Sequence, residues 1–66
     1  MAIARVTELV ASSDKSFADA INAGVDRAAK TLRGITGIEV IRQNIKVEKN
    51  KIKEYRVHLN VTFVLE

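Results

Sequence analysis

The sequence YRVHLNVTFVL, residues 55–65, alternates apolar and polar side chains. Successive side chains of a β-strand point to opposite faces, so a period of two predicts a strand with one buried face. The apolar set is Tyr55, Val57, Leu59, Val61, Phe63 and Leu65, and the intervening polar set is Arg56, His58, Asn60 and Thr62. No other stretch of the chain has so regular a pattern, and the rest of the fold is inferred around it.

A helical period precedes this strand. Apolar or small residues recur every three or four positions, at Phe17, Ile21, Gly24, Ala28, Leu32 and Ile35. We expect one amphipathic helix over about 14–33, with Ser13 as its N-cap and Gly34 as the residue that ends it. Small residues occupy the middle of the inner stripe, at Ala20, Gly24 and Ala28, and should let the helix approach a sheet closely.

Two further strands complete the fold. One runs from Ile3 to Val10, and another from Ile38 to Val47 with a change of phase between Ile41 and Asn44 that indicates a β-bulge. The residues Lys49–Lys51 suit a tight hairpin loop, because Asn50 tolerates positive φ. The sequence therefore predicts an α+β domain over 1–66, with β-α-β-β order and a three-stranded antiparallel sheet folded around the helix.

The size and composition of the chain point to self-association. A domain of 66 residues has a small core, and a sequence with no Cys and one His offers neither disulfides nor a zinc site as support. With 47% apolar and 29% charged residues the chain should fold, and its long strand edges can pair with further copies. No stretch resembles a membrane span or a signal peptide, so we expect a cytoplasmic protein.

Catalytic and metal-binding constellations are missing from the sequence. Ser12, Ser13 and Ser16 lie near a helix start, far in sequence from His58, so capping explains them better than nucleophilic catalysis. We expect no enzyme activity. The acids Asp14, Asp19, Asp26 and Glu39 have no calcium-loop spacing and are interpreted as surface charge, although symmetry-related copies could gather such carboxylates around a hard cation.

The run KVEKNKIK, residues 46–53, is the basic cluster of the chain. It could bind nucleic-acid phosphates, but Glu48 and Glu54 interrupt the charge and no aromatic residue alternates with the lysines to stack a base. A solvated hairpin tip is the favoured interpretation.

Four motifs together resemble the dodecin family over essentially the whole chain. They are SSDKSF (12–17), AAKTLR (28–33), IEVI (38–41) and KEYRVHLNVTFVLE (53–66). The resemblance implies a β-α-β-β subunit, a hollow homododecamer, and storage of flavin in pockets between subunits in place of catalysis.

Two signature residues of flavin-binding dodecins are replaced in this sequence. In those proteins a Trp precedes the short apolar-Glu-Val segment and stacks on the flavin, and a Gln follows the Tyr of the last strand. The corresponding positions here are Gly37 and Arg56. Together with Glu39 and Gln43 they are our candidate cofactor-binding residues.

The replacements weaken the expectation of riboflavin binding. Stacking on a side chain contributes about 1–3 kcal/mol, and glycine has no ring. Arg56 could stack on a ring or pair with a phosphate, which would favour FMN or another anion over riboflavin. A conformational role for Gly37 and a subunit salt bridge for Arg56 are the alternatives. For the whole protein, the alternatives to a ligand-storing shell are a structural or cation-binding shell and, third, a nucleic-acid-binding protein.

Overall fold

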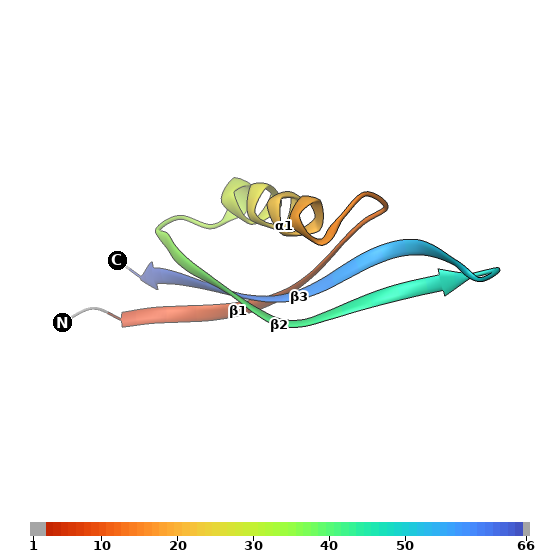
Figure 1. The fold of residues 1–66 in the computed structure, drawn as a ribbon. Helices are drawn as coiled ribbons and strands as arrows, with labels where there is room; N and C mark the ends of the chain where they lie inside the picture. Colours follow the sequence, from red (N-terminus) through yellow and green to blue (C-terminus); the bar gives the residue numbers. More distant parts are fainter. Residues whose placement is uncertain (1–2, 66) are drawn as a thin grey trace.

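The computed structural model describes residues 3–65, which form four elements. They are β1 (Ile3–Ser13), α1 (Phe17–Thr31), β2 (Ile35–Glu48) and β3 (Lys51–Leu65). β3 lies in the centre of the sheet and pairs antiparallel with β1 on one side and β2 on the other. α1 lies across one face of this sheet, packed on β1 and β3 (Figure 1). The predicted element order and antiparallel sheet are confirmed.

The core forms where the alternating strand meets the small residues of the helix. Val57, Leu59 and Val61 are fully buried, and Ala20, Gly24 and Ala28 are the buried residues of α1. A Cβ atom at Gly24 would lie only 3.0 Å from Leu59 Cδ1. The stripe of small residues therefore brings the helix backbone close to the sheet, as predicted.

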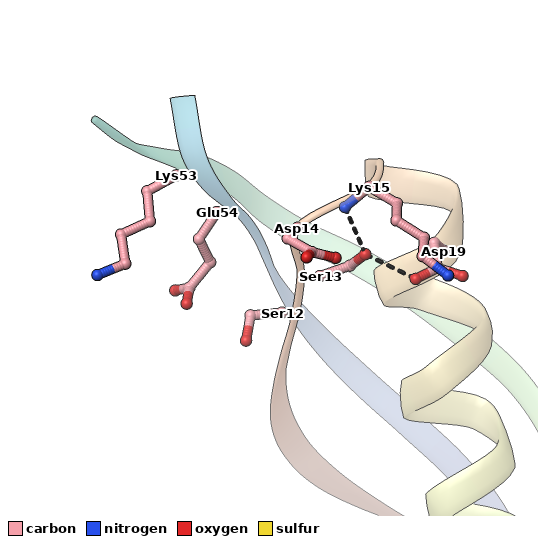
Figure 2. Close-up of a pocket in the computed structure, with 7 residues that line it drawn as sticks. All are labelled: Ser12, Ser13, Asp14, Lys15, Asp19, Lys53 and Glu54. Carbon is pink, nitrogen blue, oxygen red and sulfur yellow. Dashed lines mark hydrogen bonds between the residues drawn. The ribbon is translucent and has the colours of Figure 1, made fainter. Parts of the chain in front are cut away.

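The start of the helix differs from the prediction. α1 begins at Phe17, and its N-cap is Ser16, which has extended backbone and whose Oγ accepts the Asp19 N–H at 2.9 Å. Ser13 still pairs with Tyr55 as the last residue of β1, so its backbone belongs to the strand. Its Oγ accepts the Lys15 N–H at 2.9 Å and donates to Asp19 Oδ2 at 2.6 Å (Figure 2). Ser13 thus supports the loop before the helix and is not its cap.

Replacing Ser16 with alanine should lower the free energy of unfolding by about 1 kcal/mol, because the first turn loses its capping acceptor. The measurement is the urea midpoint at fixed protein concentration. Ser13→Ala is the matched control and should cost less, since the Ser13 Oγ accepts from no backbone N–H of α1. A larger loss of unfolding free energy for Ser13→Ala than for Ser16→Ala would contradict the assignment of Ser16 as the cap.

The end of the helix also differs from the prediction. α1 ends at Thr31, and the Leu32 N–H donates to the Ala28 carbonyl at 2.8 Å while Leu32 itself has extended backbone. Gly34 has a φ of 73° and accepts a hydrogen bond from the Val64 N–H at 3.0 Å. This glycine therefore shapes the turn that returns the chain to the sheet as β2 and is not the residue directly after the last helical turn.

The β2–β3 hairpin extends well beyond the helix and gives the subunit its elongated shape (Figure 1). Its turn is formed by Lys49 and Asn50, with φ of 52° and 62°, a pair of positive values that is typical of a two-residue hairpin. Both flanking strands are longer than the apolar patterns alone suggested, as is β1.

The predicted change of phase in β2 is confirmed. The pairing with β3 shifts between Val40 and Arg42, which leaves Ile41 as an extra residue. After this bulge the odd-numbered residues of β2, such as Gln43, point to the face that carries the helix.

Candidate ligand-binding site

The face of the sheet turned away from α1, here called the outer face, carries most of the candidate residues. In β3 the buried residues face the helix, so the polar set that alternates with them points to the outer face. Directly paired residues of antiparallel strands share a face. Gly37 pairs with Thr62 and Glu39 with Asn60, which places both on the outer face, to which Arg56 of β3 also points.

Gln43 is separated from the other three candidates. It pairs with the buried Val57 and so points to the helix side of the sheet, on the part of β2 that the helix does not cover. The cause is the bulge at Ile41, which reverses the facing of the residues that follow it. A site that uses Gly37, Glu39 and Arg56 of one outer face therefore does not include Gln43 of the same subunit.

Gly37 and Arg56 do not converge within one subunit. The partner of Gly37 on β3 is Thr62, six residues from Arg56. At 3.2–3.4 Å per residue the two positions lie about 20 Å apart along the strand. One small ligand that touches both residues must take them from different copies of the chain.

The backbone at Gly37 does not require glycine. Its φ lies outside the left-handed range, in contrast to Gly34, and a Cβ atom added there would meet no heavy atom within 4 Å. The glycine therefore leaves open space on the outer face. An aromatic ring at this position is sterically allowed, but in this chain Gly37 supplies no surface on which a ligand ring could stack.

Arg56 lines a surface pocket of about 350 Å³ with Asn44, Ile45 and Lys46, here called the Arg56 pocket. Its guanidinium Nη2 donates to Glu54 Oε2 at 2.6 Å. The Arg56 side chain is 44% exposed and that of Glu54 25%, so this ion pair is solvated and its net stabilisation is small. The sequence interpretation of Arg56 missed this pocket, because neither the pairing of Asn44 with Arg56 nor that of Lys46 with Glu54 is visible without the register.

A second pocket lies where β1 ends and the helix begins (Figure 2). Its lining comes from three segments of the chain: Ser12, Ser13, Asp14, Lys15, Asp19, Lys53 and Glu54. Three carboxylates and two ammonium groups line it, and the Ser13 Oγ donates to Asp19 Oδ2. Within residues 3–65 no group of three or more His, Cys, Asp or Glu side chains is arranged to hold a metal ion.

His58 lies in the middle of the outer face, opposite Val10 on β1 and Arg42 on β2. Its Nδ1 is buried, 3.8 Å from Glu8 Oε2, and makes no hydrogen bond to the residues that the structure describes. The imidazole therefore has a weak partner on one side and cationic neighbours on the other.

The chain is similar to known proteins in both sequence and fold. The Dodecin family model matches residues 3–66. The chain belongs to the dodecin family. A dodecin from Thermus thermophilus is 41% identical over 59 residues, which cover 89% of this chain and 86% of that protein.

Two solved dodecins are similar to this chain in structure. The structure of dodecin from Streptomyces coelicolor superposes with a TM-score of 0.94 at 32% identity, over 98% of this chain and 93% of that one. The calcium dodecin of Mycobacterium tuberculosis, described as calcium-chelating and with a novel calcium-binding site, superposes with a TM-score of 0.85 at 29% identity, over 97% and 91% of the two chains. Over the described part of the chain, no helix is long and apolar enough to cross a membrane.

Proposed function

We propose that this dodecin assembles into a closed shell of twelve copies and stores a small flat or anionic ligand of the flavin class, with weakened affinity, in pockets between copies. The shell catalyses no reaction. The observation that carries the proposal is that Gly37 and Arg56 lie on the same face of a dodecin subunit but about 20 Å apart along β3, so that only neighbouring copies can bring them to one ligand.

Exposed apolar side chains support the assembly. Nine large ones are between 42% and 61% exposed in the single subunit, and they lie on all three strands: Ile3, Val6, Val10, Val40, Ile41, Ile45, Val47, Ile52 and Leu65. Burial of apolar surface contributes roughly 25 cal/mol per Å². β1 and β2 are also edge strands of a long sheet, and contact with other copies would cover them.

The candidate residues fit a flavin ring only in part. The open space at Gly37 contributes no stacking, which removes about 1–3 kcal/mol per lost ring contact. Arg56 can lie flat against a ring or pair with a phosphate. FMN or another anionic ligand therefore fits these residues better than neutral riboflavin.

Protein purified from cells should run as a single large assembly, with a mass by light scattering equal to twelve chains of 7.3 kDa. Its absorption spectrum should show little or no flavin, because the affinity is too low to retain it through purification. A stable monomer at micromolar concentration would contradict the proposed shell. Purified protein that holds flavin tightly in every pocket would be consistent with the proposed shell, but it would contradict the proposed weakening of flavin affinity.

A cation-storing shell is the second candidate function, since a calcium dodecin is among the related structures. The described residues of one subunit do not assemble a metal site, so carboxylates from several copies would have to meet at a symmetry axis. Elemental analysis of the purified shell separates the candidates: calcium at a fixed fraction of one ion per subunit, as a site shared at a symmetry axis requires, and no organic ligand would favour cation storage.

A further inference from the structure

The base of the β2–β3 hairpin presents a cluster of cations on the outer face. Lys46 pairs with Glu54, Asn44 with Arg56, and Arg42 with His58, so these six side chains form two adjacent columns. Arg56 is diagonal to both Arg42 and Lys46, at the spacing of about 7–8 Å over which long side chains reach one another. Three cations therefore surround Asn44, and Glu54 is the one carboxylate in the two columns.

The Arg56 pocket lies within this cluster, and its hydrogen-bonding groups are mainly donors. Arg56 and Lys46 can only donate, while the Asn44 amide both donates and accepts. Groups of this kind match an oxyanion, and the planar guanidinium suits the paired oxygens of a phosphate. The volume of about 350 Å³ admits a phosphate or diphosphate group.

Glu54 does not block this use of Arg56. The ion pair engages Nη2 through one hydrogen bond, and a guanidinium carries five N–H donors. Arg56 can thus hold Glu54 and an anion together. The carboxylate still repels an incoming anion and lowers its affinity.

We propose that the Arg56 pocket is a phosphate-binding subsite, in which Arg56 and Lys46 supply the charge and Asn44 adds a neutral donor. The subsite reads a phosphate group, either the free ion or the terminal group of an ester. It rests on the proposed function, which already gives Arg56 to the ligand, but it can be tested separately with a flavin-free phosphate, because it needs no aromatic ring and lies about 20 Å along β3 from the partner of Gly37.

Titration calorimetry of the assembled protein with pyrophosphate, in the absence of flavin, tests the subsite. We expect a dissociation constant on the order of 1 mM. Arg56→Gln should weaken binding about tenfold or more and Lys46→Gln severalfold, since each removes a charge-assisted hydrogen bond. Glu54→Gln should strengthen binding severalfold, because it removes the competing carboxylate. Lys30→Gln, a loss of the same charge from the exposed side of α1, is the matched control and should have no effect.

Other phosphate ligands and the control variant test the proposed subsite further. Inorganic phosphate and glycerol 3-phosphate distinguish the sources: equal affinity indicates that the phosphate group alone is read, and a preference for the ester indicates a terminal phosphate. Absence of pyrophosphate binding at about 20 times the expected constant would overturn the proposal. An equal loss in Lys30→Gln and Lys46→Gln would overturn it as well, because general charge would then be responsible. Tight binding of a single-stranded oligonucleotide without pyrophosphate binding would assign the cluster to nucleic acid instead.

Discussion

Leu59→Ala should destabilise the subunit by about 2–5 kcal/mol, the usual cost of truncating a fully buried leucine. Leu59 is fully buried at the centre of β3, where Gly24 of the helix lies against it. Small domains have total stabilities near the lower end of 5–15 kcal/mol, so this one change removes a large part of the stability. Urea unfolding at fixed protein concentration measures the loss, because association contributes to the apparent stability.

Gly24→Ala provides the matched test of this contact. In the wild type the new Cβ lies 3.0 Å from Leu59 Cδ1 and 3.3 Å from Ala11 Cβ, and this crowding should offset the gain in helix propensity of about 1 kcal/mol. In the Leu59→Ala background the crowding by Leu59 is absent, so the same substitution should stabilise the protein. An identical effect of Gly24→Ala in both backgrounds, or a cost of Leu59→Ala below about 1 kcal/mol, would show that the helix does not pack on Leu59 as described.

The fold could be predicted where a pattern extends over many residues. The alternating side chains of β3 and the stripe of small residues on α1 form the two sides of one interface. The burial of Leu59 and Gly24 confirms both patterns. The predicted start of the helix was wrong, because Ser13 and Ser16 are both residue types that can cap a helix and the neighbouring sequence does not distinguish them. Only the pairing of Ser13 with Tyr55 excludes the first, and this tertiary contact has no local signal.

The candidate site was less predictable, because it depends on register. The change of phase in β2 was predicted, but its effect on Gln43 follows only once Ile41 is known to be the extra residue. The cluster around Arg56 likewise arises from cross-strand pairs such as Lys46 with Glu54, which join residues on either side of the hairpin turn. A sequence pattern indicates which face is apolar within one strand, but not which polar residues of two strands lie opposite one another.

Gly37→Trp should increase riboflavin affinity roughly tenfold to hundredfold. A ring at this position restores stacking worth about 1–3 kcal/mol per contact. The backbone permits the change, since φ at Gly37 is not left-handed and the space around an added Cβ is open to 4 Å. Quenching of riboflavin fluorescence measures the affinity, and light scattering checks that the variant assembles like the wild type.

Gly37→Leu is the matched control, because it adds apolar surface at the same position without a ring. A gain confined to tryptophan attributes the effect to stacking, whereas equal gains for both variants attribute it to burial. FMN titrations of Arg56→Gln, alone and combined with Gly37→Trp, then test the contribution of Arg56. If Arg56 pairs with the phosphate, its loss should lower the affinity for FMN and change that for riboflavin little. Tight riboflavin binding by the wild type would mean that other residues form the pocket, since neither Gly37 nor the outer face around it supplies a ring to stack on.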